Sequence, residues 1–214
     1  MLLLSGLFIS HLSAGTITEV TSGTLHNSST TYAGQSFFTP AGGPWYDITF
    51  NFLADSTPFA TGTAFLLSQK LTWSLCCGDP PPIYTPLTLD ATAPGFIAAS
   101  IGIVNGQYVF DPSVTLQPST LYYLYENGVI PSGTISGGDN VACCVAYFAD
   151  ASSAYFPSFA SANFQVSGSV VPEPGTAGLI SLGLLAFLHA GRRGKRERKS
   201  RAANEPNGVG ESRA

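Results

Sequence analysis

Charged residues are scarce in this chain, and cations are almost absent before position 192. The 214 residues include 13 acidic and 9 basic side chains. Lys70 is the only Lys or Arg before Arg192, so residues 16–171 carry nine carboxylates against one ammonium, a formal balance of 1 − 9 = −8. A protein that neutralises nucleic-acid phosphates needs clustered Lys and Arg. We therefore expect no nucleic-acid partner for this part of the chain.

Histidine is also scarce, which removes the parts of several enzyme classes. His11 and His189 lie in terminal hydrophobic segments, and His26 stands in a polar loop beside Asn27-Ser28-Ser29, where a solvated side chain is expected. A single solvated histidine supplies neither the positioned base of a Ser-His-Asp triad nor the several ligands of the common histidine metal sites. The nucleophile elbow, the P-loop and the EF-hand loop are absent as motifs. We expect a protein that is not an enzyme, with no catalytic residue, cofactor or metal.

The N-terminal residues 1–15 have the form of a secretory signal peptide. MLLLSGLFISHLS is an apolar run, and Ser13, Ala14 and Gly15 supply the small residues of a cleavage site. The run lacks the usual positive n-region, and a first hydrophobic strand is the alternative. Export would place the following domain, residues 16–170, outside the cytoplasm.

The C-terminal residues 171–201 consist of a proline motif, an apolar segment and a basic cluster. Val171-Pro172-Glu173-Pro174-Gly175 precedes residues 176–191 (TAGLISLGLLAFLHAG), which as a transmembrane helix would be about 24 Å long at ~1.5 Å per residue. Behind it stand seven cations that should hold the tail in the cytoplasm by the positive-inside rule: Arg192, Arg193, Lys195, Arg196, Arg198, Lys199 and Arg201. Residues 202–214 are expected to be a disordered tail.

This three-part arrangement resembles the C-terminal sorting signal of the bacterial PEP-CTERM family. The likeness rests on Val171, Pro172, Glu173 and Pro174, the short helix rich in Gly, Leu and Ala, and the Arg-rich tail. The resemblance implies export, recognition by the membrane transpeptidase exosortase, cleavage near the motif and release or anchoring at the cell surface, in bacteria that make exopolysaccharide. The tail beyond Arg201 is longer than is usual for the family. A plain C-terminal membrane anchor is the alternative, although it leaves Pro172-Glu173-Pro174 unexplained.

The interior is expected to be all-β. Residues 45–52 alternate, with Tyr46, Ile48, Phe50 and Phe52 on one face. Similar patterns return at residues 71–75, 107–110, 121–125 and 163–170, where Phe164, Val166 and Val170 share a face. Asn105-Gly106 between apolar runs predicts a hairpin. Many short strands separated by turns favour an antiparallel β-sandwich or jelly roll.

A weaker likeness concerns residues 35–50. Gln35 to Pro40, Gly43-Pro44-Trp45 and Ile48-Thr49-Phe50 are similar to segments of the choice-of-anchor domains. These are β-rich secreted modules that precede several alternative surface-anchoring signals, and the resemblance implies placement and fold rather than an activity.

Four cysteines stand as two adjacent pairs, Cys76-Cys77 and Cys143-Cys144. An even number in an exported chain favours disulfides, and bridges between the pairs would close a loop of roughly 65 residues and stabilise the fold by about 3–5 kcal/mol in the chain-entropy model. Buried thiols are one alternative. A zinc site is another, although tetrahedral sites usually space their ligands by two to four residues.

The remaining candidate groups are carboxylates and tyrosines. Most of the acids stand beside Gly, Pro or Asn and are expected to be turn residues, although two acids at glycosidase spacing can come from anywhere in a sandwich: Asp79, Asp90, Asp111, Glu126, Asp139 and Asp150. Asp79 and Asp139 could also offer oxygens to Ca²⁺. The row Leu121 to Tyr125 puts large side chains on both strand faces, which indicates core packing or, alternatively, a platform for sugar rings.

These patterns together predict an exported surface or extracellular-matrix protein with a structural or adhesive role. The partners that follow are exosortase, the membrane through the C-terminal helix before processing, and exopolysaccharide. The alternative is a secreted carbohydrate-binding or glycoside-hydrolysing protein of the same architecture. An uncleaved, receptor-like anchored domain is a third hypothesis.

Overall fold

The fold is all-β and its strand pairs are antiparallel, as the sequence predicts. It is seen in a computed structural model that describes residues 15–71, 84–138, 144–158 and 161–170. Within these ranges there is no helix, and so none that is long and apolar enough to cross a membrane. The expected signal peptide and C-terminal helix lie outside the described residues.

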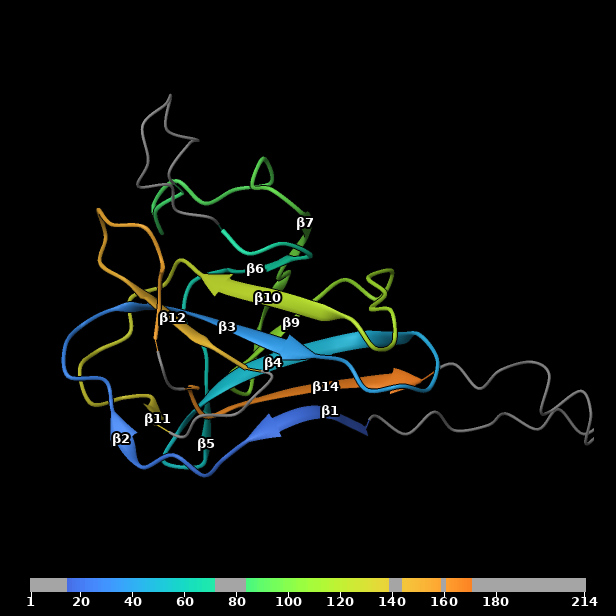
Figure 1. Ribbon diagram of the computed structural model, residues 1–214, viewed down its shortest axis with the longest axis horizontal. Coiled ribbons are helices and arrows are strands. Elements are labelled where there is room, and N and C mark those ends of the chain that lie inside the picture. Colours follow the sequence, from blue (N-terminus) through green and yellow to red (C-terminus); the bar gives the residue numbers. More distant parts are fainter. Residues whose placement is uncertain (1–14, 72–83, 139–143, 159–160, 171–214) are drawn as a thin grey trace, which may run out of the picture. The chain divides into compact units, whose positions relative to one another are not determined.

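Two six-stranded sheets form the two layers (Figure 1). In the first sheet the order is β1 (Gly15–Val20), β14 (Phe164–Val170), β4 (Trp45–Ala54), β9 (Gln107–Val109) and β8 (Gly102–Val104), with β5 (Thr57–Phe59) pairing with β4. In the second sheet the order is β13 (Phe156–Pro157), β12 (Ala146–Ala149), β3 (Tyr32–Phe38), β10 (Leu121–Glu126), β6 (Ala64–Leu67) and β7 (Phe96–Ala99). A small ribbon pairs β2 (Leu25–His26) with β11 (Ser136–Gly137).

The main core lies between the sheets and is rich in phenylalanine. The Phe50 ring of the first sheet is 5.7 Å from Phe164 in a stacked arrangement, 5.1 Å from Phe52 edge-on and 6.3 Å from Phe37 of the second sheet. All four side chains are at most 1% exposed. Because burial of such a side chain contributes roughly 1.5–3 kcal/mol, this contact between the layers is a major source of stability. Ile48, Phe50 and Phe52 of β4 and Phe164 and Val166 of β14 face this core, as the alternating pattern predicts.

A second core covers the outer face of the second sheet. Tyr125 of β10 packs against Tyr147 and Tyr155, with ring centroids 5.3 Å and 4.7 Å apart. Leu71 and Leu89, from the segments that flank residues 72–83, are buried in the same cluster. Both faces of β10 are therefore packed, Tyr122 and Leu124 toward the main core and Tyr125 toward this second one. The tyrosine row serves as core, and a sugar platform on it is wrong for these buried rings.

Most strand predictions are confirmed. Strands β9, β10 and β14 fall at the expected residues, and residues 72–75 of the range 71–75 lie outside the described residues. Asn105 and Gly106 join β8 to β9 with φ of +52° and +75°. These values belong to a type I′ turn, which explains why this dipeptide predicts the hairpin.

One face assignment in β4 is wrong. Tyr46 was expected beside Ile48 and Phe50, but it is only half-buried, while Trp45 and Ile48 are both in the main core. The cause is a β-bulge against β14: Ser167 pairs with Thr49 and Ser169 with Tyr46, so two residues of β4 oppose one of β14. Asp47 takes a φ of +51° there, and the alternation shifts by one residue.

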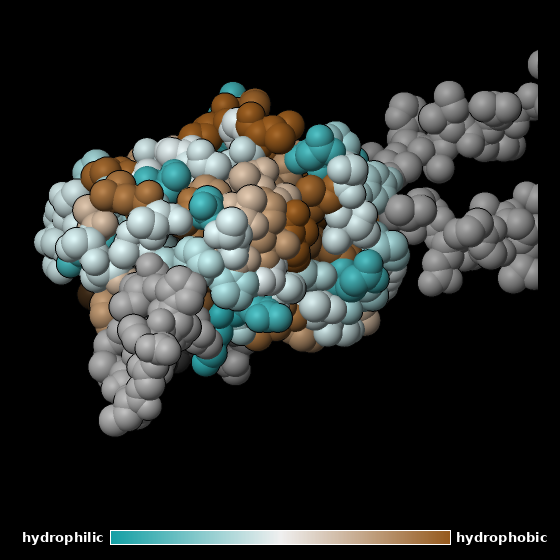
Figure 2. Space-filling model, turned by 90° about the horizontal axis from the view of Figure 1, so that it is seen from above, coloured by the Kyte–Doolittle hydropathy of each residue, from teal (hydrophilic) through white to brown (hydrophobic). Residues whose placement is uncertain are grey.

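Charged groups remain sparse on the folded surface. Figure 2 shows a face on which strongly hydrophilic residues are scattered in small patches among neutral and hydrophobic ones. Lys70, the only Lys or Arg of the described residues, is exposed. Several large hydrophobic side chains also reach the surface, among them Leu25, Leu87 and Ile101, each at least 65% exposed. Any recognition by this domain must therefore work largely without cations.

Candidate functional site

The predicted sorting and topology residues lie outside the described residues. These are the motif Val171, Pro172, Glu173 and Pro174 and the basic cluster from Arg192 to Arg201. The nearest described residue is Val170, the last residue of β14. That strand is internal, because it pairs with β1 on one side and β4 on the other. The last described strand thus ends immediately before the motif.

The cysteine pairs are described only in part. Cys144 is buried in the main core, and its carbonyl oxygen accepts a hydrogen bond from the Ser161 hydroxyl. Cys76, Cys77 and Cys143 lie outside the described residues, so the predicted disulfides stay predictions. No group of three or more His, Cys, Asp or Glu side chains that could hold a metal ion occurs within the described ranges.

Three of the candidate acids are turn residues, as expected. Asp90, Asp111 and Asp150 each accept two hydrogen bonds from the residue two positions further on, one from its backbone N–H and one from its hydroxyl. The side-chain and backbone hydrogen bonds to these carboxylates lower their pKa values. Such local pairs stabilise turns and leave no carboxylate directed into a cleft. Asp79 and Asp139 lie outside the described residues.

Glu126 accepts a turn hydrogen bond from Gly128, two residues further on, but the prediction of a mere turn residue missed its burial and its place in the sheet. It ends β10 and is fully buried. Its Oε1 accepts the Ala33 backbone N–H at 2.7 Å and its Oε2 accepts the Gly128 N–H at 2.7 Å. Ala33 is the β3 residue opposite this strand end, so the carboxyl group takes the place of a ladder hydrogen bond between β10 and β3.

The surroundings of Glu126 favour its neutral form. Burial raises its pKa to about 8, although the two backbone N–H donors and the Tyr108 hydroxyl act in the opposite direction. The Tyr155 hydroxyl donates to the Glu126 backbone carbonyl at 2.6 Å, and burial raises the pKa of this phenol far above its ordinary value. No Lys or Arg contributes to these interactions. Burial is thus the largest influence on this pKa and shifts it toward the neutral form.

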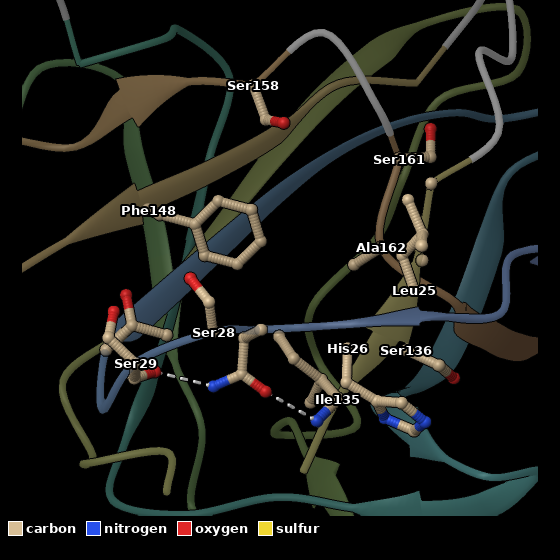
Figure 3. Close-up of a pocket in the computed structure, with 14 residues that line it drawn as sticks. Leu25, His26, Ser28, Ser29, Ile135, Ser136, Phe148, Ser158, Ser161 and Ala162 are labelled. Carbon is tan, nitrogen blue, oxygen red and sulfur yellow. Dashed lines mark hydrogen bonds between the residues drawn. The ribbon is translucent and has the colours of Figure 1, made fainter. Parts of the chain in front are cut away.

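A pocket of about 370 Å³ opens beside the β2–β11 ribbon (Figure 3). Its polar lining consists mostly of serine: Ser28, Ser29, Ser136, Ser158 and Ser161. The apolar part comes from Leu25, Ile135, Phe148 and Ala162. Figure 3 shows the Phe148 ring between Ser158 and Ser28, with the Ser28 hydroxyl directed toward the ring. Among the described lining residues there is no Asp, Glu, Lys or Arg.

Asn27 holds the wall of this pocket in place. Its Nδ2 donates to the carbonyl oxygens of Ser29 and Pro131, both at 2.9 Å. Its Oδ1 accepts the backbone N–H groups of Thr134 and Ile135 at 2.9 Å and 3.1 Å. One amide side chain thereby fixes the 27–29 loop against the segment 131–135. The wall is built by long-range contacts, with sequence separations above 100 residues.

His26 lies at the edge of the pocket rather than simply in solvent. Its side chain is 38% exposed, and its Nε2 is 3.4 Å from the Asp55 Oδ1, whose side chain is 81% exposed. The prediction of a solvated side chain is right about exposure, but His26 belongs to β2 and not to a loop, and it has a partner in Asp55. A pair this exposed contributes at most about 1 kcal/mol. No sequence pattern joins His26, Phe148 and Ser161, which come from separate parts of the chain.

No protein-family model, curated protein or solved structure matches this chain.

Proposed function

We propose that this chain is an exported bacterial surface or extracellular-matrix protein that exosortase processes at its C-terminal signal. Its role is structural or adhesive rather than catalytic, and its mature environment is the exopolysaccharide around the cell. The observation that carries the proposal is the order of Pro172-Glu173-Pro174, an apolar segment without a charged residue at 176–191 and seven cations at 192–201. The apolar segment and the cations would together hold the proline motif at the outer membrane surface.

The apolar segment and the cations position the motif. The segment favours the hydrocarbon layer, while cations at its C-terminal end favour the cytoplasmic side. Glu173 then stands just outside the bilayer between two prolines, which hold the backbone extended and carry no N–H groups. An extended segment at a fixed height is a suitable substrate for a membrane-embedded protease.

The described domain is compatible with cleavage at this point. Its last strand, β14, ends at Val170 and is paired on both sides. Cleavage after the motif would therefore remove no described strand and no core side chain. Attachment through an internal strand would also transmit a pull on the anchor to both β1 and β4 instead of peeling an edge strand away.

The experiment is an intact-mass measurement of the mature protein from an exosortase-carrying host and from the same strain without exosortase. We expect the first strain to yield a species that lacks residues 192–201 and the second to retain them. A mature species that still contains Arg192 to Arg201 in the first strain would contradict the proposal. It would favour a plain membrane anchor.

A matched pair of substitutions tests the motif itself. In the Glu173→Ala variant we expect the mass of the uncleaved chain, because the substitution removes the acid that the two prolines present to the protease. Glu205→Ala is the control, since Glu205 is also followed by a proline but lies in the tail beyond the basic cluster. Equal processing of both variants would show that Glu173 is not read.

The hydrolase alternative has less support than the binding alternative. The pocket contains no carboxylate in its described lining, Glu126 is buried, and three of the aspartates are committed to turns. Hydrolysis of a glycoside usually needs two carboxyl groups about 5–10 Å apart across a cleft. Binding needs only hydroxyl groups and an aromatic surface, which the pocket has.

A further inference from the structure

The pocket beside the β2–β11 ribbon brings hydroxyl groups and an aromatic ring together in one hollow. It combines serine hydroxyls with one partly buried aromatic ring, and its described lining includes no Asp, Glu, Lys or Arg. Phe148 packs on the main core with one side and lines the pocket with another. Ligand pockets have volumes of about 300–1,000 Å³, and this one, at 370 Å³, lies at the lower end.

The polar groups of the lining fall into two classes. The hydroxyls of Ser136 and Ser161 donate hydrogen bonds to the carbonyl oxygens of Leu53 and Cys144, so these two side chains stabilise the pocket wall. Ser28 and Ser29 are exposed, and their hydroxyls make no hydrogen bond within the described part of the chain. These two hydroxyls, on the loop that Asn27 fixes, are therefore available to a ligand at little cost in ordering.

Charge narrows the class of ligand. Among the described residues, the ionisable groups at the pocket are His26 in the lining and Asp55, whose Oδ1 is 3.4 Å from the His26 Nε2. No Lys or Arg stands in the described lining to attract an anion, and the interior of the chain carries a formal charge of −8, counted as nine carboxylates and one ammonium. Hydroxyl groups beside an aromatic face match a neutral ligand that has both hydroxyls and a C–H face.

We propose that this pocket binds one neutral hexose unit, with the ring seated on Phe148 and its hydroxyls bonded to Ser28 and Ser29. The space holds roughly a dozen water molecules at ~30 Å³ each, which suits a single sugar ring and not a longer buried oligosaccharide. A short, uncharged contact of this kind binds weakly, with a dissociation constant in the range of about 1 mM. The inference is independent of the C-terminal signal, because the described residues that line the pocket lie between Leu25 and Ala162.

The test is a titration of the ¹⁵N-labelled full chain with methyl hexopyranosides, followed by amide chemical shifts. The detergent must carry no sugar headgroup, and the probes are the glucoside, galactoside and mannoside, with methyl glucuronide as the anionic comparison. We expect saturable shifts at amides of Ser28, Gly137 and Phe148 for at least one neutral probe, and weaker shifts for the glucuronide.

Two substitutions separate binding from folding. Phe148→Leu keeps apolar volume but removes the ring, and should weaken binding by about fivefold or more. Ser28→Ala should weaken it by about two- to tenfold. Phe38→Leu is the matched control: this side chain is 41% exposed and stands near the other end of β3, five residues or about 17 Å from the Ala33 that pairs with Phe148. It should leave the affinity unchanged.

The outcomes that would overturn the inference are distinct. One is the absence of saturable shifts for all three neutral probes at about 100 mM, roughly a hundred times the expected constant. Another is a set of shifts that maps away from the pocket. A third is an equal loss of binding in Phe148→Leu and Phe38→Leu while both spectra remain folded. None of these results bears on cleavage at Pro172-Glu173-Pro174, which the mass measurement tests separately.

Discussion

The buried carboxyl group of Glu126 makes the stability of the domain depend on pH. Its pKa is about 8 in the folded domain against an ordinary value of 4.5. The folded protein therefore keeps a proton that the unfolded chain releases. The contribution of Glu126 to the free energy of unfolding is therefore fully present below about pH 4.5. It is lost as the pH rises from about 4.5 to about 8, and above about pH 8 no further change is expected.

The loss of unfolding free energy follows from the difference between the folded and the ordinary pKa of Glu126. A difference of 8 − 4.5 = 3.5 units corresponds to about 5 kcal/mol at ~1.36 kcal/mol per unit, which is an upper limit for the loss of unfolding free energy. Many domains have a total of only about 5–15 kcal/mol. Mildly alkaline solution should therefore weaken this domain substantially.

Glu126→Gln removes the titration and keeps most of the shape. The amide oxygen can still accept one of the two N–H groups, from Ala33 or Gly128, but the amide nitrogen cannot accept the other. A buried N–H without an acceptor costs about 1–3 kcal/mol. The variant should thus be less stable than the wild type near pH 4.5. Above pH 8, once the wild type has lost its contribution, the variant should be the more stable of the two, by at most about 2–4 kcal/mol.

The assay is urea unfolding followed by tryptophan fluorescence at five pH values between 4.5 and 8.5. The two curves of unfolding free energy against pH should cross. Asp111→Asn is the control. The exposed carboxylate of Asp111 has a lowered pKa, so its contribution to the free energy of unfolding is lost as the pH falls and not as it rises. A wild-type curve that is flat across the interval, or an equal slope in Glu126→Gln, would refute the reasoning.

Three further predictions concern the core and the cysteines. Phe50→Ala should lower the free energy of unfolding by about 3–5 kcal/mol in urea titrations, because its ring contacts both sheets. Gly34→Ala should lower it by about 1–3 kcal/mol, since a Cβ there would overlap the Tyr125 ring, whereas Gly102→Ala meets open space and should change it by no more than about 0.5 kcal/mol. Alkylation of the denatured, unreduced protein should label none of the four cysteines, and a labelled thiol would contradict the expected pair of disulfides.

The features that the sequence predicts correctly are those set by neighbouring residues. Alternation along a strand has a period of two, so Phe50 and Phe52 reveal their common face without knowledge of a partner strand. The Asn105-Gly106 hairpin is also local, because its two positive φ angles are a property of those two residues. The same holds for Asp111, whose turn partner is two residues away.

The features that it misses depend on contacts across the chain. The bulge that turns Tyr46 away from the core arises from the pairing of β4 with β14, which is distant in sequence. Glu126 accepts a hydrogen bond from Ala33, 93 residues earlier. A cue was present in its spacing, since Tyr122, Leu124 and Glu126 are alternate residues and share the inward face. Its Asn-Gly neighbours hid this, because an acid in that setting usually belongs to the turn.

The scarcity of cations has different consequences for the two ends of this protein. In the described domain no Lys or Arg acts on Glu126 and none stands in the described lining of the pocket, so the proposed sugar is held by uncharged hydrogen bonds and apolar contact. Neither interaction depends strongly on salt. The basic cluster after Arg192 is the reverse case, since its attraction to anionic headgroups is electrostatic and acts within a Debye length. Raising the ionic strength from about 0.15 M to about 1 M shortens that length from ~8 Å to ~3 Å. Salt should therefore weaken the hold of the tail on the membrane surface while sugar binding and the pH dependence of the domain stay nearly constant, which makes the two halves of the proposal separable in one preparation.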